Sequence, residues 1–484
     1  MNKLDTVKFA LIASLTASYA LVNGTVASFS AEPAQTALQN FRITVDQPAS
    51  AGLPVWIRGE RDAPRPAHYP YSDDPRDFGN NLVEMRRFEN HPLAALHSCR
   101  AIAVAPSGPV SGEDFDQPFG PRLPKNCLPL HLEFPLDKPG VYQVRWTKVR
   151  KSLTGGAIKE KETVLARSNW LTFTIKASTG EERKIWLKKK LANIPTSEKD
   201  LLSQYLPSLL SAAPDQAVLQ VLVRQIYAHD GAGHGAVPNA GPASYYAATS
   251  LELFNQRDST SLILNTIRQR GANELMAYYI SWNAPQFENV KEQLVTETLP
   301  FLHARDNNKV SNSLTLLYYL ANRKKFHWPA DSSTLIAADK CVLAAGPSLV
   351  ARHSQAIDHA LAQYLGLGTV KQSRAQARVL LWKIVERPEV IQPESSEAGR
   401  EQAIICLSWL GDPADLPKLG GLLSKNRKSD KSGHQLSNLP YQLKLVYGAQ
   451  AIPYLKKGLT DSPYPSVRTE CRYVLETDEQ QPTK

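Results

Sequence analysis

The sequence predicts two unlike parts, a β-sandwich near the N-terminus and a longer series of paired α-helices after it. From about residue 41 to 176, short runs of alternating apolar residues are separated by Pro- and Gly-rich turns. Beyond about residue 197, apolar residues recur every three to four positions, as in amphipathic helices. The 484 residues leave room for more than one domain, and the hydrophobic fraction of 42% suffices for ordinary cores.

The first 27 residues have the pattern of a secretory signal. Lys3 and Lys8 precede an apolar run from Phe9 to Val22, and small residues follow at positions 25–27. A helix that spans a bilayer needs roughly 20 apolar residues, so an uncleaved membrane anchor is the disfavoured alternative. We expect residues 1–27 to be a cleaved signal peptide, the protein to be secreted or periplasmic, and no later stretch to span a membrane.

Charge gives little information about a partner. The formal net charge is +10, but the Lys and Arg residues are scattered along the chain. The densest basic clusters lack the interleaved aromatic residues of a groove that binds single-stranded nucleic acid. We therefore interpret the basic residues as a solvated surface and do not expect a nucleic-acid partner.

The chain contains five cysteines. Cys99 and Cys127 lie in the same N-terminal region, and in an oxidising compartment they are the one pair that we predict to form a disulfide. Cys341, Cys406 and Cys471 each fall within a helical apolar pattern, which predicts small buried hydrophobic residues. The absence of a CxxC motif argues against a cysteine zinc site or a thioredoxin-like redox centre.

The sandwich is predicted to occupy residues 38–177. Its expected strands are 41–45, 53–58, 82–86, 130–134, 141–146 and 170–175, with residues 151–156 in a long connection between the last two. The stretch LDKPGVYQVRWT, residues 136–147, resembles the late hairpin of an immunoglobulin-like domain, in which a Pro-Gly turn leads into a Tyr-containing strand. The Cys-Trp-Cys spacing of antibody domains is absent, so the resemblance concerns architecture alone.

The helical part is predicted to begin after residues 178–196, which form either a charged linker or a first helix. Residues 477–484 are polar, and we expect a disordered tail there. The expected helices before the C-terminal repeats are 200–210, 216–227, 242–254, 259–270, 290–303, 311–321, 335–343, 354–365 and 374–385.

The last 85 or so residues contain an internal repeat. In Gly448–Glu476, one apolar helical stripe ends at Asp461-Ser-Pro and a second stripe begins near Val467. Residues 401–423 repeat part of this pattern, and aligning Pro417 with Pro453 gives a period of 453 minus 417, or 36. A fainter copy begins at Leu299-Pro300. This pattern resembles the HEAT repeat, which implies an α-solenoid of stacked helical hairpins over residues 197–476.

The HEAT resemblance also implies structural roles for four residues. Asp412, Asp461 and Arg468 fall at or just after the turns between helices. Asp461 is placed to cap the second helix of its unit or to pair with an arginine of a neighbouring unit, and Asp412 to do the same. Val467 is expected in the apolar core between units. The resemblance thus assigns these residues to stacking rather than catalysis.

Two groups of residues could bind a metal ion. His229 and His234 flank Asp-Gly-Ala-Gly, but the glycines oppose a helix that would hold both imidazoles on one face, which favours a loop between helices. Asp73, Asp74 and Asp77 lie in the Pro-rich stretch 63–81, which lacks the DxDxDG spacing of a calcium loop. The turn-forming tendency of Asp explains them better. We predict no metal and no cofactor.

No motif in the sequence identifies an enzyme. The chain lacks a GxSxG elbow, a Walker loop, a Rossmann glycine triplet and the His-Glu dipeptide used by HEAT-repeat metal enzymes. We therefore predict a non-enzymatic extracytoplasmic binding or scaffolding protein with a protein partner. The alternative is an extracytoplasmic hydrolase with its site in the stretches 63–81 and 229–241, because a Ser-His-Asp triad is recognised by geometry and not by sequence. The sequence specifies neither the partner nor the oligomeric state.

Overall fold

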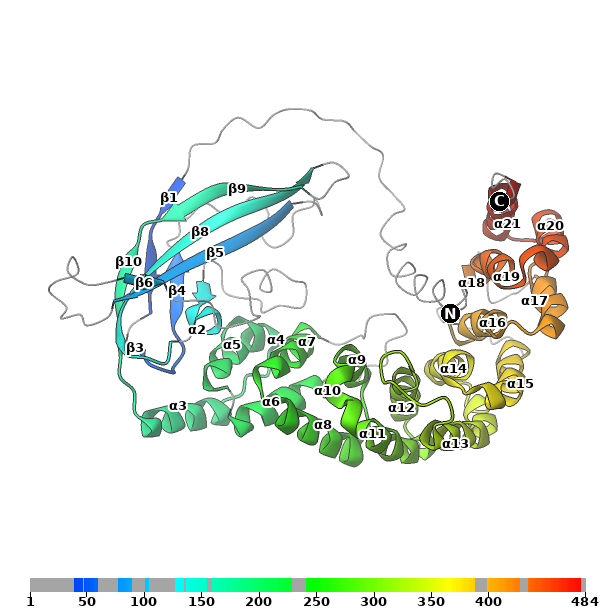
Figure 1. Ribbon diagram of the computed structural model, residues 1–484, viewed down its shortest axis with the longest axis horizontal. Helices are drawn as coiled ribbons and strands as arrows, with labels where there is room; N and C mark the ends of the chain where they lie inside the picture. Colours follow the sequence, from blue (N-terminus) through cyan, green and yellow to red (C-terminus); the bar gives the residue numbers. More distant parts are fainter. Residues whose placement is uncertain are drawn as a thin grey trace. The chain divides into compact units, whose positions relative to one another are not determined.

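A computed structural model describes residues 39–46, 48–59, 77–88, 101–103, 127–134, 136–154, 159–213, 215–228, 241–387, 398–426 and 434–479. The signal-peptide prediction lies outside these residues, as does the predicted C-terminal tail from residue 480 on. Residues 477–479, also predicted to belong to that tail, end helix α21 (Pro465–Glu479), so this part of the tail prediction was wrong. The described chain is mostly helical, with its strands near the N-terminus (Figure 1). It divides into two compact units, 1–212 and 213–484. The division follows residue 212, whereas the sequence led us to expect it near residue 197.

Unit 1 contains two β-sheets. In the larger sheet, strands β1, β9, β8, β10 and β3 are neighbours in that order, and β5 pairs with both β8 and β6. The smaller sheet has the antiparallel order β2-β4-β7. The strands are β1 (Gln39–Phe41), β2 (Ile43–Val45), β3 (Ala49–Ser50), β4 (Trp56–Gly59), β5 (Asp77–Phe88), β6 (Ala101–Ala103), β7 (Cys127–Pro129), β8 (Gly140–Thr154), β9 (Lys159–Ser168) and β10 (Leu171–Lys176).

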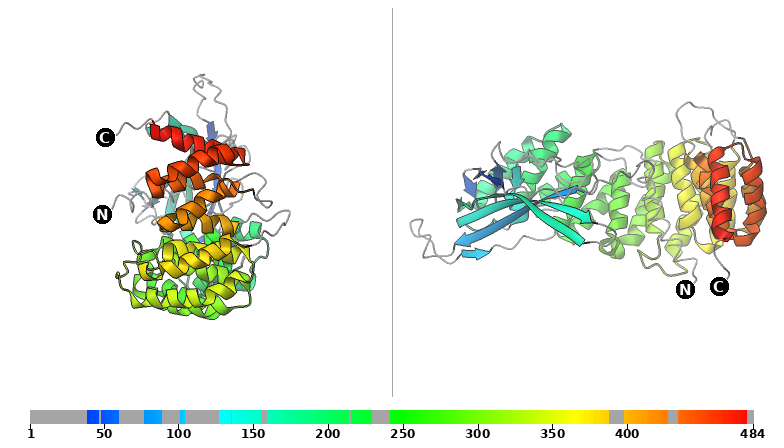
Figure 2. Two further views of the ribbon diagram at one scale, coloured as in Figure 1. Left: turned by 90° about the vertical axis from the view of Figure 1, so that its right-hand side faces the viewer. Right: turned by 90° about the horizontal axis from the view of Figure 1, so that it is seen from above.

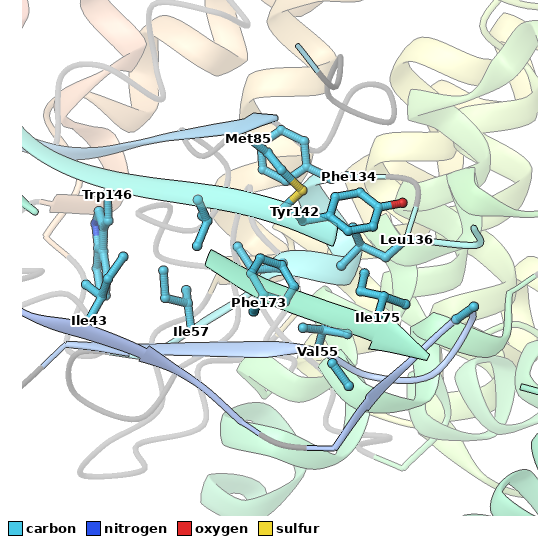
Figure 3. Packing of buried hydrophobic residues seen from close by; sticks show 14 of the residues in the cluster. Ile43, Val55, Ile57, Met85, Phe134, Leu136, Tyr142, Trp146, Phe173 and Ile175 are labelled. Carbon is cyan, nitrogen blue, oxygen red and sulfur yellow. The ribbon is translucent and has the colours of Figure 1, made fainter. Parts of the chain in front are cut away.

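The two sheets enclose one apolar core (Figure 3). Ile43 and Ile57 enter it from the smaller sheet, and Tyr142, Trp146 and Phe173 enter it from the larger one. The ring centroids of Tyr142 and Phe173 are 5.8 Å apart in a stacked arrangement. Because side chains alternate across a strand, β8 contributes every second residue to this core, namely Tyr142, Val144 and Trp146.

Four local predictions in this region were wrong. The expected strand 41–45 is interrupted at Arg42, and β1 and β2 join different sheets. Residues 130–133 form a short helix, α2 (Leu130–Glu133), and not a strand. The expected connection 151–156 mostly extends β8, and residues 77–81 of the expected loop begin β5. Asp77 lies opposite Ser152 in that register. Continuous backbone pairing of β5 with β8 outweighs the polar composition there, because it supplies hydrogen-bond partners for the backbone of both strands.

On the outer face of the larger sheet, Trp170 lies between two arginines. The guanidinium carbon of Arg86 is 4.1 Å from the Trp170 ring centroid and that of Arg145 is 4.7 Å from it. Arg145 also donates two hydrogen bonds of 2.7 Å to the carboxylate of Glu84, its cross-strand partner. Cation–π contact and a bidentate ion pair thus stabilise the solvent-facing side of the sheet.

Helices complete unit 1. Residues 180–192, expected as a linker or first helix, form α3 (Gly180–Ala192), which begins with a capping box between Thr179 and Glu182. Short helical segments follow: α4 (Glu198–Asp200), η4 (Leu201–Tyr205), α5 (Leu206–Leu209) and η5 (Leu210–Ala212). The η segments are 3-10 or π-helical.

His131 of α2 joins the sheets to these helices. Its Nε2 lies 2.8 Å from the carbonyl oxygen of Pro207, and its Nδ1 lies 3.1 Å from both the amide nitrogen and the carbonyl oxygen of Val55. In the neutral imidazole with its proton on Nε2, Nε2 donates to Pro207 and Nδ1 accepts from the Val55 N–H. Burial lowers the pKa of His131, although its two backbone contacts oppose the shift.

We expect unit 1 to lose stability as the pH falls below about 6.5, the ordinary pKa of histidine. The unfolded chain then binds a proton that folded His131 resists, so the free energy of unfolding decreases between pH 6.5 and the lowered pKa of the folded state. One proton contributes at most about 1.4 kcal/mol per pH unit. Urea unfolding from pH 7.5 to 5.0 measures this dependence. His131→Leu should flatten it, and an unchanged slope would contradict the assignment.

Unit 2 consists of helices that pack in pairs, and the pairs stack in two rows. The first row contains α6 (Gln216–Ile226), α8 (Gln256–Arg270), α11 (Lys291–Thr298), α13 (Ser333–Val350), α15 (Arg374–Val385), α17 (Leu416–Leu422) and α20 (Ile452–Asp461). The second row contains α7 (Pro242–Thr249), α9 (Glu274–Trp282), α12 (Asn307–Leu320), α14 (Gln355–Gln363), α16 (Ala398–Leu410), α19 (Leu439–Tyr447) and α21 (Pro465–Glu479). Figure 2 shows helices of unit 2 lying side by side. In Figure 1 the second row follows the inner side of the arc that unit 2 forms.

Short segments complete unit 2. They are η6 (Ser250–Leu253), α10 (Ala284–Phe287), η7 (Glu288–Val290), η8 (Leu299–His303), η9 (Tyr364–Gly368), η10 (Lys371–Ser373), η11 (Pro413–Asp415), α18 (His434–Ser437) and η12 (Gly448–Ala451).

Glycines allow neighbouring helices of the second row to approach closely. A Cβ atom placed on Gly366 of η9 would lie 2.4 Å from the Cβ of Cys406 in α16. One placed on Gly399 of α16 would lie 2.4 Å from the Cβ of Asp358 in α14. Both distances are far below a van der Waals contact, so the spacing between α14 and α16 depends on these two glycines.

Two of the three prolines that mark the repeat in the sequence occupy equivalent positions in the structure. Pro417 and Pro453 each occupy the second position of a first-row helix, α17 and α20. Proline is tolerated there because the first turn needs no intrahelical N–H donor. Pro300 instead lies in η8, which follows α11. The faint copy at 299–300 is therefore not equivalent to the other two.

One described helix, α13, is long and apolar enough to cross a membrane by length and composition, with a mean hydropathy of 1.2. The expectation that no later stretch spans a membrane stays a prediction. Packing nevertheless explains its composition, because α13 contacts α11, α14 and α15. Its Asp339 is buried and accepts 2.8 Å hydrogen bonds from the Tyr364 hydroxyl and the Val370 N–H. We interpret α13 as a core helix of unit 2.

Candidate functional site

Of the five residues considered as candidate metal ligands, the structure describes Asp77. His229, His234, Asp73 and Asp74 lie outside the described residues, as do most of the loops proposed for a hydrolase site. Asp77 lies in β5. Within the described part of the chain, no group of three or more His, Cys, Asp or Glu side chains could hold a metal ion.

The cysteine predictions have three outcomes. Cys99 lies outside the described residues, so its disulfide with Cys127 stays a prediction. Cys406 and Cys471 are buried as expected, and burial raises the pKa of each thiol to about 12. Cys341 is exposed, so the prediction that it is buried was wrong. The buried stripe of α13 includes Val342, and the neighbouring position 341 lies outside it.

Asp412 is both a cap and an ion-pair partner. Its Oδ1 accepts a 2.9 Å hydrogen bond from the Ala414 N–H, and its Oδ2 lies 2.8 Å from Nη1 of Arg378 in α15. Asp415, which the sequence did not indicate, is fully buried beside it. The Asp415 carboxylate accepts from Arg378 Nε at 2.6 Å and from Trp382 Nε1 at 2.7 Å. The carboxylates of Asp412 and Asp415, in the turn that follows α16, thus bind side chains of α15.

Asp461 does not cap the following helix. It is the last residue of α20, and its Oδ1 accepts a hydrogen bond of 2.7 Å from Thr460. Ser462 stabilises the turn between α20 and α21 instead. Its hydroxyl accepts a hydrogen bond from the Tyr464 N–H, and its carbonyl oxygen accepts one of 2.5 Å from Arg468 Nη1. An N-cap residue directly precedes its helix, whereas Asp461 lies four positions before Pro465, the first residue of α21. Val467 is fully buried, as predicted for the core between helices.

Aromatic side chains gather on three adjacent helices of the second row. Tyr245 comes from α7, Tyr278 and Trp282 from α9, and Tyr318 and Tyr319 from α12. Helix α9 packs between α7 and α12. We call these five residues the tyrosine cluster.

In the tyrosine cluster, the ring of Tyr278 meets those of Trp282 and Tyr319 edge to face. The ring centroids of Tyr278 and Trp282 are 5.6 Å apart at an interplanar angle of 70°. Those of Tyr278 and Tyr319 are 6.5 Å apart at 72°, and Tyr318 and Tyr319 are 5.2 Å apart and tilted. Edge-to-face contact suits the electrostatic quadrupole of aromatic rings, and it fixes the orientation of Tyr278 from two sides.

The cluster is buried at one side and open at the other. Tyr245 is buried, Tyr278 and Tyr319 are partly exposed, and Trp282 is 69% exposed. Burial raises the pKa of Tyr245 and Tyr319, and the nearby carboxylate of Glu274 raises both further. The phenols therefore stay neutral at physiological pH. A neutral phenol can donate a hydrogen bond.

Such an arrangement is suited to binding. Tyr and Trp present large areas with few rotatable bonds, and each combines an apolar ring with a hydrogen-bond donor. Both residue types are enriched among the residues that dominate the binding energy of protein interfaces. An indole as exposed as that of Trp282, supported by the ring of Tyr278, has the properties of an anchor for a partner surface.

Sequence reasoning missed this site because it missed helix α9. The segment Glu274–Trp282, ELMAYYISW, is apolar at nearly every position and shows no clear helical period. Two signals could have identified it. Asn273 directly precedes the segment and accepts a hydrogen bond from the Met276 N–H as its cap, and Tyr278 and Trp282 are four residues apart.

No model of a known protein family and no curated protein matches the chain. The tyrosine cluster is therefore interpreted from its own residues and geometry.

Proposed function

We propose that the chain is a non-enzymatic binding or scaffolding protein that works outside the cytoplasm and holds a protein partner on the second row of unit 2. The tyrosine cluster carries this proposal. Its exposed Trp282, backed by oriented neutral tyrosines, has the composition of a binding hot spot. The cluster spans three consecutive helices, which gives room for an extended contact.

A HEAT-like solenoid is the architecture that we propose for unit 2. The stacked helix pairs and the 36-residue spacing of Pro417 and Pro453 support it. For the sheets of unit 1 we propose an immunoglobulin-like sandwich. The hydroxyl of Tyr142, near the start of β8, donates a 2.9 Å hydrogen bond to the carbonyl of Lys138, as in the tyrosine corner of that fold.

The proposed location outside the cytoplasm rests on the N-terminal sequence. Lys3 and Lys8, the apolar run to Val22 and the small residues after it form the three regions of a secretory signal. A protein partner in the same compartment is therefore the one to seek.

Trp282→Ala should weaken partner binding by about 30-fold, because truncating a hot-spot residue costs about 2 kcal/mol or more. Purified wild-type and variant proteins are coupled to beads, exposed to the native envelope or secreted fraction, and compared by quantitative mass spectrometry. A partner of this surface is retained by the wild type and lost from Trp282→Ala.

Tyr473→Ala is the matched control. Tyr473 lies on α21 of the same row, is 58% exposed, and belongs to no part of the tyrosine cluster. It should retain the partner. A partner that Trp282→Ala retains as well as the wild type would contradict the assignment of the binding surface.

A further inference from the structure

We propose that the outer face of the larger sheet in unit 1 binds an acidic polysaccharide, and that Arg86 pairs with one of its carboxylate groups. This face lies on β5, β8, β9 and β10, and β5 and β9 flank β8 over part of its length (Figure 1). The face belongs to unit 1, so its ligand is independent of the partner proposed for the tyrosine cluster of unit 2.

The guanidinium of Arg86 is held in place while its charge stays unpaired. The Arg86 side chain is exposed, and its guanidinium carbon lies 4.1 Å from the Trp170 ring centroid. Within the described chain, this side chain makes no ion pair and no hydrogen bond. The carboxylate of Glu84, two residues earlier on the same face, instead accepts two hydrogen bonds of 2.7 Å from Arg145. Because stacking uses the face of a guanidinium, the N–H groups at the edge of Arg86 are free for a ligand.

Positive charge exceeds negative charge on this part of the sheet. Residues directly opposite each other on paired strands share a face. Three such pairs bring charged residues to the outer face, namely Arg86 with Gln143, Glu84 with Arg145, and Arg167 with Thr147. Across these pairs, three guanidinium groups accompany one carboxylate. Arg167 donates to the Thr147 hydroxyl oxygen at 3.3 Å through Nε, which leaves its terminal nitrogens available. The face is therefore complementary to an anion.

The residues beside Arg86 can recognise hydroxyl groups. Gln143 lies between Arg86 on β5 and Thr172 on β10, and its amide donates a 3.1 Å hydrogen bond to the Thr172 hydroxyl oxygen. The other amide proton and the carbonyl oxygen of Gln143, and the hydroxyl proton of Thr172, have no partner among the described residues. Together they can donate to and accept from sugar hydroxyls, which need both. The three side chains form a row across two strand spacings, about 10 Å.

Among the described side chains of this sheet, no large apolar one is exposed. Trp170 is partly exposed, but guanidinium carbons lie 4.1 Å and 4.7 Å from its ring centroid and cover it. Protein interfaces depend on aromatic anchors, and membrane-surface helices insert apolar side chains into the lipid. Charge combined with hydroxyl recognition favours a polysaccharide instead, and the guanidinium fork matches the carboxylate of an acidic sugar.

The test titrates the full-length protein with hexagalacturonate and with the same hexasaccharide after its carboxyl groups are reduced to alcohols. Calorimetry at about 0.15 M salt limits long-range attraction. We expect hexagalacturonate to bind about tenfold more tightly than the reduced hexasaccharide. Arg86→Gln should weaken hexagalacturonate binding by about tenfold, because it removes a charge-assisted hydrogen bond. Arg86→Lys should recover part of that loss, since lysine keeps the charge but lacks the fork.

Arg257→Gln is the matched control. Arg257 is an exposed arginine on α8 in unit 2, so this variant loses the same charge without changing the sheet. It should bind hexagalacturonate as the wild type does. Thermal unfolding of each variant establishes that a loss of affinity does not reflect a loss of structure.

Equal affinity for the acidic and the reduced hexasaccharide, or binding of neither, would overturn the inference. Wild-type affinity in Arg86→Gln would overturn it as well. A hexaglutamate peptide carries as many side-chain carboxylates as hexagalacturonate and should bind more weakly. Equal binding of that peptide would assign the face to an acidic protein segment, and binding to phosphatidylglycerol vesicles without binding to hexagalacturonate would assign it to an anionic lipid surface.

Discussion

Val467→Asp is expected to destabilise the C-terminal helices of unit 2 by about 3 to 5 kcal/mol, the cost of an unpaired charge in a protein interior. Val467 is 0% exposed, and its helix α21 packs against α18, α19 and α20. The chain offers no described helix pair beyond α20 and α21 to compensate. The last pairs should therefore unfold before the rest of unit 2.

Hydrogen exchange measures this effect segment by segment. Amides in Gly448–Glu476 should lose protection, while those of α12 and α14 retain it. Tyr473→Asp introduces the same charge at an exposed position of the same helix and should change stability by no more than about 0.5 kcal/mol. Unchanged protection of Gly448–Glu476 in Val467→Asp would contradict the stacked-repeat interpretation of this stretch.

Asp415→Ala is expected to cost about 3 kcal/mol, because it leaves Arg378 Nε and the indole N–H of buried Trp382 without the buried acceptor that they share. The carboxylate is fully buried and accepts both hydrogen bonds at 2.7 Å or less. Arg378 retains one contact, with Asp412, which places the effect near the lower end for a broken buried pair.

Asp412→Ala provides the matched comparison. Asp412 pairs with the same arginine and caps η11, but its side chain is 39% exposed. Water can replace its contacts, so the loss should be about 0.5 to 2 kcal/mol. Chemical unfolding of both variants measures the two costs. An Asp412 effect as large as the Asp415 effect would mean that burial does not control the strength of this network.

Buried polar contacts join successive helix pairs elsewhere in unit 2 as well. Arg387 follows α15, donates to both carboxylate oxygens of Asp358 on α14, and accepts from Arg400 on α16 through its own carbonyl. Burial raises the pKa of Asp358, while the Arg387 hydrogen bonds oppose that shift. Apolar stripes alone would allow one helix pair to slide on the next. Directional contacts of this kind fix the register between them.

Structural features that depend on residues close together in the sequence could be predicted, whereas features that depend on contacts between distant residues could not. Helices 216–226 and 374–385 were predicted nearly to the residue, because apolar periodicity and capping are local properties that the sequence states directly. The burial of Val467 and Cys406 follows from the same stripes. The presence of strands before residue 177 and of helices after it was likewise determined by the sequence alone.

Tertiary structure decided what depends on distant partners. Residues 77–81 are in a strand because they pair with residues 148–152 of β8, and residues 151–154 because they pair with residues 159–162 of β9. Residues 130–133 are helical where His131 reaches Val55 and Pro207. The pairing of Asp415 with Arg378 depends on the packing of α15 against the turn after α16. The tyrosine cluster exists only because stacking brings α7, α9 and α12 together. No local pattern encodes that meeting, since its residues span positions 245 to 319 of the chain.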